Sequence, residues 1–313
     1  MSRRTIFYFS LPFILTAVLW FTLRAPSAFP VGETIKIPKG ITLSEAGEKL
    51  KENNIIGRDF IFKVLVWLQS PRAGVIAGDY LFTTRTNLWS VAKRLARGDF
   101  GIEYRRVTIP EGATAIEAGL LITKAIPKFD RKTFNQLIKD SEGYLFPDTY
   151  FFSPAITPAE AFATMRGNFE EKTNGLAPLI VRSGHSLEEI IIMASLLEEE
   201  AKNPEQRRVI SGILWRRIAE EMPLQVDAVF PYIIGRNTFQ LTRADLATDS
   251  PYNTYKYAGL PAGPISNPGL DAIIAALEPI ESDYLFYLSD LSGKMHYAAN
   301  FDDHVANKRK YLR

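Results

Sequence analysis

The sequence has no cysteine and only three histidines among its 313 residues. The absence of cysteine excludes disulfides, thiolate nucleophiles and cysteine metal sites together. His185, His296 and His304 are scattered and lack the usual spacing of metal ligands, so we expect neither a metal site nor a cofactor. The formal net charge is only +2, and no basic stripe with interleaved aromatics occurs. Nucleic acid is therefore not expected as a partner.

The chain does contain one long apolar run, at residues 6–23, which carries no charge. At 1.5 Å per residue it reaches roughly 27 Å, about one hydrocarbon core. Two arginines precede the run and only Arg24 follows it directly, which places residues 1–5 in the cytoplasm and the rest outside. A cleaved signal peptide is the alternative, but the nearest small-residue site has Pro26 at its −3 position. We predict an uncleaved anchor over 6–23 and a linker over 24–32.

A repeat follows the linker, with one copy at residues 35–47 and the other at 107–119. Each copy predicts a short strand, a Pro-x-Gly turn and a helix that is capped by threonine with glutamate three residues later. Helices are also predicted at 60–68 and 87–97, and a strand at 78–82. This strand–helix rhythm over 33–124 resembles LysM carbohydrate-binding modules. A folded spacer without a ligand is the alternative.

The most pronounced helical pattern lies at residues 186–202 and reads SLEEIIIMASLLEEEAK. Ser186 and Glu189 predict a capping box, and apolar residues then occupy nearly every face, as in a buried core helix. A second helix is predicted directly afterwards, with Asn203 as its N-cap and Pro204 at its first position. The tight junction between the two helices would fix the geometry at the end of the first.

The first of these helices ends in three consecutive carboxylates, Glu198, Glu199 and Glu200. The carbonyl end of a helix, apolar neighbours and adjacent like charges should all raise a carboxyl pKa, and a general acid needs a raised pKa near neutral pH. At about 100° per residue, Glu200 projects beside Met193 and Leu197, and Glu198 projects on the far side of that stripe. Glu199 points away, toward solvent. Glu198 and Glu200 therefore cannot face each other as a catalytic pair. Alternatively, all three sit where the helix emerges into water.

Several other segments add polar or aromatic groups to this picture. Aromatics alternate with acids over 142–152, which suits the wall of a sugar-binding site, although an ordinary core strand gives the same pattern. The loop at 224–227 is expected to return near the end of the carboxylate helix. Pro- and Gly-rich loops are predicted at 250–255 and 259–269. A short helix is predicted at 271–277, a pair of strands within 284–298, and a closing helix from Phe301.

Five motifs now stand in one order: EGYLFPDTY at 142–150, ASLLEEEA at 194–201, LQVD at 224–227, YNTY at 252–255 and GLPAGPISNPG at 259–269. Together they resemble the endolytic murein transglycosylase family, also called YceG-like, over nearly the whole chain. The resemblance implies an α+β protein with a single N-terminal transmembrane helix. It also implies a small LysM-like β/α region over 33–124 and a mixed α/β catalytic domain over 125–313.

The resemblance implies a lytic transglycosylase that is anchored in the bacterial inner membrane and acts outside it on peptidoglycan glycan strands. Such enzymes cleave between N-acetylmuramic acid and N-acetylglucosamine without water, leave a 1,6-anhydro end, and would trim or terminate nascent strands. The family's catalytic acid falls on Glu200. Peptidoglycan synthases in the membrane are candidate partners. The candidate substrate-binding residues are Glu142, Asp148, Glu198, Gln225, Asp227, Tyr252, Asn253 and Thr254.

The sequence departs from the family's usual pattern at three positions. Glu199 stands where lysine is common between the two acids, which should raise a neighbouring carboxyl pKa further. Val226 and Ala228 replace a small hydroxyl residue and a proline, which puts the fine geometry of that loop in doubt.

Two other functions remain open. One is a water-using muramidase with Asp227 as the partner carboxylate, and the other is a non-enzymatic, glycan-binding scaffold for wall synthesis. Glu198 is expected to orient the helix.

Overall fold

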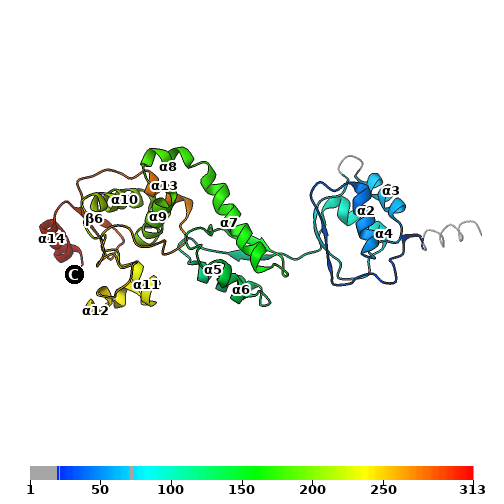
Figure 1. Cartoon of the computed structure of the whole chain (residues 1–313), viewed down its shortest axis with the longest axis horizontal. Coiled ribbons are helices and arrows are strands. Elements are labelled where there is room, and N and C mark those ends of the chain that lie inside the picture. Colours follow the sequence, from blue (N-terminus) through cyan, green and yellow to red (C-terminus); the bar gives the residue numbers. More distant parts are fainter. Residues whose placement is uncertain (1–19, 21, 71–73, 313) are drawn as a thin grey trace, which may run out of the picture. The chain divides into compact units, whose positions relative to one another are not determined.

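The computed structural model describes residues 20, 22–70 and 74–312, and the chain divides into two compact units between Glu103 and Tyr104 (Figure 1). Nearly all of the predicted anchor at 6–23 lies outside the described residues. Within the described ranges, no helix combines the length and the hydropathy that are needed to cross a membrane.

The first unit has the order strand, helix, helix, strand, helix. Its elements are β1 (Thr34–Ile37), α2 (Leu43–Glu52), α3 (Asp59–Gln69), β2 (Gly78–Leu81) and α4 (Leu88–Arg97). The two strands pair antiparallel, with Thr34 opposite Leu81. The helices predicted at 60–68 and 87–97 are confirmed as α3 and α4. Carbohydrate binding by this unit stays a prediction.

The segment predicted as a linker is held against the first unit. Phe29 is buried in the core of that unit, in edge contact with Phe82. Arg85 donates hydrogen bonds to the carbonyl oxygens of Pro26 and Ser27, at 2.7 and 2.8 Å. Residues 24–32 are thus fixed to the unit that they lead into.

The second unit begins with a layer of helices over a two-stranded sheet. It contains β3 (Arg105–Thr108), α5 (Ala115–Ala125), α6 (Arg131–Leu137), β4 (Thr149–Phe152) and α7 (Pro158–Asn174). β3 pairs antiparallel with β4, so the second copy of the repeat finds its strand partner within the second unit. We expected the small N-terminal region to extend to residue 124, whereas the contacts group residues 104–124 with the second unit because of this pairing.

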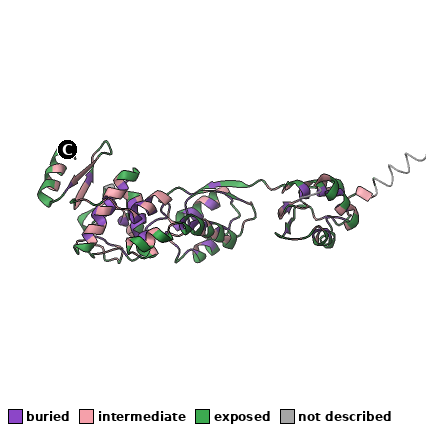
Figure 2. Ribbon diagram, turned by 90° about the horizontal axis from the view of Figure 1, so that it is seen from above, coloured by how far each residue is buried: buried purple, intermediate pink, exposed green. Residues whose placement is uncertain are grey.

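The rest of the second unit surrounds one buried helix, α9 (Leu187–Glu200), which packs along α13 (Leu270–Leu277). All eight residues from Ile190 to Leu197 are buried, as the apolar pattern predicted, and buried residues fill the interior between the helices (Figure 2). The other elements are α8 (Ala177–Ser183), α10 (Pro204–Ala219), α11 (Val229–Ile234), a 3₁₀ turn (Thr238–Gln240), α12 (Arg243–Leu246), β5 (Phe286–Ser289), β6 (Met295–Ala298) and α14 (Phe301–Tyr311).

Local capping defines where α9 begins and where the next helix starts. The predicted capping box is confirmed: the Ser186 hydroxyl accepts from the Glu189 amide at 3.2 Å, and the Glu189 carboxylate accepts from the Ser186 amide at 2.8 Å. Asn203 caps α10, and Pro204 is its first residue. Only three residues separate α9 from α10, so the carboxylates at the end of α9 lie at a short connection between two helices.

Candidate active site at the end of helix α9

Glu200, the last residue of α9, lines a cavity of about 460 Å³ in the second unit. The cavity also receives side chains from α10, from the 224–227 loop, from the β5–β6 hairpin and from α14. Its lining comprises Glu200, Arg217, Leu224, Gln225, Asp227, Tyr255, Phe286, Tyr287, Leu288, Ser289, Met295, Phe301, His304 and Lys308. Of the nine candidate residues predicted from the sequence, the structure therefore brings three together here: Glu200, Gln225 and Asp227.

The Glu200 carboxyl group is held by one hydrogen bond in surroundings that favour its neutral form. The Tyr287 hydroxyl donates to Oε2 of Glu200 at 2.9 Å. Burial raises the pKa of Glu200 to about 7, against the lowering effect of that hydrogen bond, and the nearby charge of Asp227 raises it further. The expectation of a raised carboxyl pKa is met at Glu200, with desolvation as the main cause. Glu200 can therefore carry a proton near neutral pH.

Arg217 of α10 joins two walls of the cavity. Its guanidinium is buried, and its Nε donates to the carbonyl oxygen of Leu285 at 2.7 Å. Its Nη1 donates to the carbonyl oxygen of Leu224, also at 2.7 Å. Leu285 precedes β5, which carries Tyr287, and Leu224 begins the loop that carries Asp227. Burial lowers the pKa of Arg217, yet a guanidinium remains charged at any physiological pH.

The 224–227 loop has a constrained backbone that Thr254 holds in place. Gln225 has a φ of 53°, a left-handed conformation that is uncommon for a residue with a side chain. Its amide donates to the Thr254 carbonyl at 3.0 Å, and the Val226 amide donates to the Thr254 hydroxyl at 3.0 Å. The Tyr255 hydroxyl then donates a short hydrogen bond to the Asp227 carboxylate. The YNTY motif thus positions the loop that faces Glu200.

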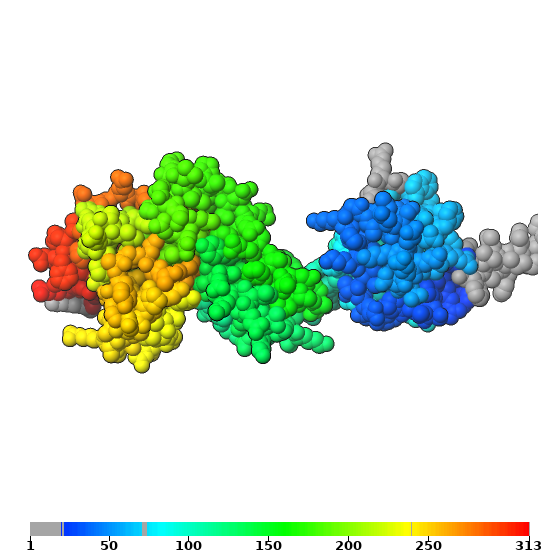
Figure 3. Space-filling model, in the orientation of Figure 1, coloured from blue at the N-terminus to red at the C-terminus, as the bar shows by residue number. Residues whose placement is uncertain are grey.

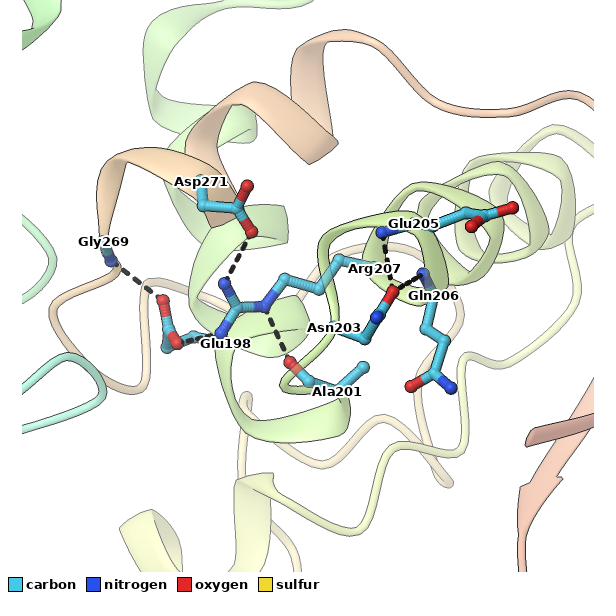
Figure 4. A network of polar contacts seen from close by, with 8 residues as sticks. All are labelled: Glu198, Ala201, Asn203, Glu205, Gln206, Arg207, Gly269 and Asp271. Carbon is cyan, nitrogen blue, oxygen red and sulfur yellow. Dashed lines mark hydrogen bonds and ion pairs between the residues drawn. The ribbon is translucent and has the colours of Figure 1, made fainter. Parts of the chain in front are cut away.

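Glu198 points into a different environment from Glu200, as the helical wheel predicted. Its side chain is only 6% exposed and accepts a short hydrogen bond from Arg207, which also donates to Asp271 at 2.8 Å (Figure 4). The other oxygen of Glu198 accepts from the Gly269 amide at 2.9 Å. Through these bonds Glu198 ties α9 to α10 and to the start of α13.

Glu199 is exposed, as expected, and lines a second cavity of about 370 Å³ together with Glu117 and Tyr232. The Glu199 side chain brings an acidic group to that cavity, beside a second one from Glu117. Within the described part of the chain, the Glu199 cavity and the Glu200 cavity have no lining residue in common.

Two further candidate residues are engaged away from the Glu200 cavity. Glu142 accepts from the Ala115 amide at 2.9 Å and from the Asn267 side chain at 3.1 Å. Burial raises the pKa of Glu142 to about 7. Asp148 is exposed and accepts from the side chain of Asn168 at 3.1 Å. Glu142 thus joins the start of α5 to the GLPAGPISNPG loop.

The three candidate substrate-binding residues of the YNTY motif, Tyr252, Asn253 and Thr254, contact neighbouring segments of the second unit. Asn253 and Thr254 are both 1% exposed. The Asn253 side chain donates to the backbone carbonyls of Leu246 and Thr248, at 3.0 and 2.8 Å. Tyr252 packs its ring against that of Tyr232, with centroids 5.1 Å apart. The side chains of Asn253 and Thr254 thus form hydrogen bonds with backbone groups of neighbouring loops.

Sequence reasoning did not single out three residues that surround the Glu200 carboxyl group: Arg217, Tyr255 and Tyr287. Tyr255 stood inside a recognised motif, so its signal was available. Arg217 lies in a predicted helix and Tyr287 in a predicted strand. No local sequence pattern around either residue indicates a role in the site. Among the described residues, no three metal-ligating side chains are grouped as a metal site.

The arrangement combines the half-buried carboxyl group of Glu200, which can hold a proton, with the Asp227 side chain in the lining of the same cavity. Such a site suits proton donation to a leaving oxygen, with negative charge nearby to stabilise a developing cation. The tyrosine and phenylalanine side chains around it offer apolar faces that sugar rings can pack against, beside polar groups that can meet hydroxyls.

Comparisons with a family model, with curated proteins and with solved structures all find YceG-like proteins or proteins named endolytic murein transglycosylase. The YceG-like family matches residues 35–310. An endolytic murein transglycosylase of Bacillus subtilis (strain 168) is 31% identical over 305 residues, covering 89% of this chain and 84% of that protein. A protein of the same name from Streptococcus pneumoniae serotype 2 is 26% identical, covering 97% of this chain and 62% of that protein. The crystal structure of a putative yceG-like protein from Listeria monocytogenes is 27% identical with a TM-score of 0.61, and it covers 88% of this chain and 99% of that one.

Proposed function

The chain belongs to the YceG-like family, and on this premise we propose that it is a peptidoglycan lytic transglycosylase with Glu200 as its acid. The observation that carries the proposal is the position of Glu200, which lines the cavity with a pKa of about 7 and accepts one hydrogen bond from Tyr287. A carboxyl group in that state is protonated in a large fraction of molecules at neutral pH, as a general acid requires.

The first step is cleavage of the bond between N-acetylmuramic acid and N-acetylglucosamine. Protonated Glu200 donates its proton to the glycosidic oxygen while the bond from that oxygen to the anomeric carbon of the muramic acid breaks. Positive charge then develops on the sugar ring, as in other glycosidic cleavages. Asp227 accepts a hydrogen bond from Tyr255 and lines the same cavity, which supports a role in stabilising this charge.

The second step closes the ring without water. The 6-hydroxyl of the same muramic acid attacks the anomeric carbon, and Glu200 takes up the proton that this hydroxyl loses. The product is a 1,6-anhydro end, and the enzyme is regenerated. Because the nucleophile belongs to the substrate, it is already close to the reacting carbon and needs no second protein carboxylate.

A second candidate function is a water-using muramidase, because Asp227 shares the cavity with Glu200 and could activate a water molecule. The two functions give different products. We would digest peptidoglycan in water enriched in ¹⁸O and weigh the fragments. Anhydro ends without ¹⁸O support the transglycosylase, whereas reducing ends that carry ¹⁸O would replace it with the muramidase. Absence of cleavage would favour a glycan-binding scaffold.

We further propose that residues 6–23 anchor the protein in the inner membrane, with residues 1–5 in the cytoplasm and the rest outside. This placement would bring the cavity to nascent glycan strands and near peptidoglycan synthases. A reporter enzyme that is active only outside the cytoplasm, fused to the C-terminus, tests the orientation. Activity of the fusion supports the proposal, and an inactive but intact fusion contradicts it.

A further inference from the structure

Helix α3 of the first unit is apolar on two opposite faces, and only one of them is covered. Phe62 and Val66 are fully buried in the core of the unit. The opposite face carries four large apolar side chains with high exposed fractions: Phe60 at 72%, Val64 at 41%, Trp67 at 59% and Leu68 at 59%. We call these four residues the α3 stripe.

The α3 stripe is continuous. At about 100° per residue, its four positions fall within an arc of about 100° on one side of the helix. The atoms of α3 lie at the surface of the first unit in the space-filling view (Figure 3). A helix that is apolar on both sides needs a second apolar partner, and a contiguous exposed apolar patch marks an interaction surface.

The start of the described chain indicates which partner this is. Leu23, the last residue of the predicted anchor, and Ala25 both pack against the core of the first unit. Phe29 is buried in the same core, and Arg85 binds the carbonyl oxygens of Pro26 and Ser27. The residues that connect the apolar run at 6–23 to the first unit are therefore fixed to that unit and do not form a flexible linker.

We propose that the α3 stripe lies in the interfacial layer of the same bilayer that holds residues 6–23. A unit tied so closely to a membrane span must sit at the membrane surface, where an apolar helix face is stabilised by insertion among lipids. Tryptophan is favoured at that depth. Lys63 borders the stripe, paired with Asp59 at 3.2 Å, and its long stem allows its charge to reach the head groups.

A lipid surface fits the α3 stripe better than a glycan strand does. A carbohydrate site needs placed hydrogen-bond donors and acceptors beside its aromatic faces. Of the four stripe side chains, only the Trp67 indole carries a hydrogen-bonding group. The inference rests on the predicted anchor and not on the catalytic role of Glu200.

The absence of cysteine allows a direct test with single labels. Three full-length variants, Val64→Cys, Glu48→Cys and Leu15→Cys, are labelled with an environment-sensitive dye and reconstituted in vesicles of phosphatidylethanolamine and phosphatidylglycerol with brominated acyl chains. Glu48 is exposed on α2 and serves as the matched control, while Leu15 reports insertion of the anchor. We expect quenching at positions 64 and 15 that is several-fold stronger than at position 48.

Other patterns would overturn the proposal. Quenching at position 15 alone would leave the anchor in place and remove the α3 stripe from the membrane. A position 64 label that responds to added glycan strands and not to lipid would assign the stripe to carbohydrate. Quenching at neither 15 nor 64 would remove the anchor as well. Glycan cleavage by the same labelled proteins reports the catalytic proposal separately.

Discussion

Tyr287 donates a hydrogen bond of 2.9 Å to the Glu200 carboxyl group, although 87 residues separate the two in the chain. The bond joins the β5–β6 hairpin to the end of α9 and leaves the other carboxyl oxygen of Glu200 free to carry a proton. It also lowers the Glu200 pKa against the larger, raising effect of burial. Tyr287 therefore orients the acid and also moderates the rise in the Glu200 pKa that burial causes.

Replacing Tyr287 with phenylalanine should shift the pH profile of cleavage. The hydrogen bond lowers the Glu200 pKa, so its loss raises that pKa, and the alkaline limb of kcat/KM should move to higher pH. The maximal rate should fall by roughly tenfold, because the acid loses its orientation. Profiles of wild type, Tyr287→Phe and Tyr284→Phe would be compared, the last being a change in the loop just before β5. An unshifted limb in Tyr287→Phe would argue against the assigned role.

Burial of Glu200 should cost stability at alkaline pH. Its pKa is about 7 in the folded protein and near 4.5 in the unfolded chain. Below pH 4.5 Glu200 is protonated in both the folded and the unfolded protein, so it has no effect on stability. Between pH 4.5 and pH 7 it ionises first in the unfolded protein, which is thereby favoured. Above 7 the loss is complete, up to about 3 kcal/mol. Glu200→Gln should therefore gain stability relative to wild type between about pH 4 and pH 8 in urea unfolding. A difference that stays constant over this range would contradict the shift.

Arg217 should act as a positioning residue for both walls of the cavity. Lysine lacks the planar fork with which the Nε and Nη1 of Arg217 donate to the carbonyl oxygens of Leu285 and Leu224, so Arg217→Lys should lower the free energy of unfolding by roughly 1–3 kcal/mol. It should lower kcat more than it raises KM, because Asp227 and Tyr287 lose their relative placement. Arg208→Lys is the control, since Arg208 is half-exposed and makes one such bond, to Glu278. Equal effects of the two changes would refute this account.

Glu198 should matter for folding rather than for chemistry. Glu198→Gln leaves Arg207 buried with a weakened partner, and removing one member of a buried pair costs roughly 3 kcal/mol. Glu278→Gln, which disturbs only partly exposed pairs with Arg182 and Arg208, should cost about 1 kcal/mol or less. Urea unfolding measures both. Under conditions where Glu198→Gln remains folded, it should keep most of its cleavage activity, and a stable but inactive variant would contradict the structural role.

The features that sequence reasoning predicted are those that local rules determine. The capping box of Ser186 and Glu189, the cap at Asn203 and the divergence of Glu198 from Glu200 depend on residues only a few positions apart. Helical geometry alone therefore places them. The conclusion that Glu200 is the family's acid came from resemblance, since the wheel separates the three carboxylates without saying which one faces a cavity.

Features that depend on contacts between distant segments could not be predicted in the same way. Tyr287 reaches Glu200 only because the β5–β6 hairpin packs beside α9, and Arg217 meets Leu285 across 68 residues. The strand partner of β3 was missed for the same reason, because β4 follows two helices later. Apolar and acidic alternation over 142–152 likewise does not distinguish a sugar contact from the backbone bonds that Glu142 makes.

The central claim is that Glu200, and not another neutral carboxyl group of the second unit, is the catalytic acid. Glu142 is the matched comparison, because its pKa is also raised to about 7 while it lies outside the lining of the Glu200 cavity. We would measure glycan cleavage by wild type, Glu200→Gln and Glu142→Gln, with unfolding curves for each. The account predicts that Glu200→Gln folds and releases no anhydro fragments, while Glu142→Gln retains cleavage. Anhydro fragments from folded Glu200→Gln would contradict it.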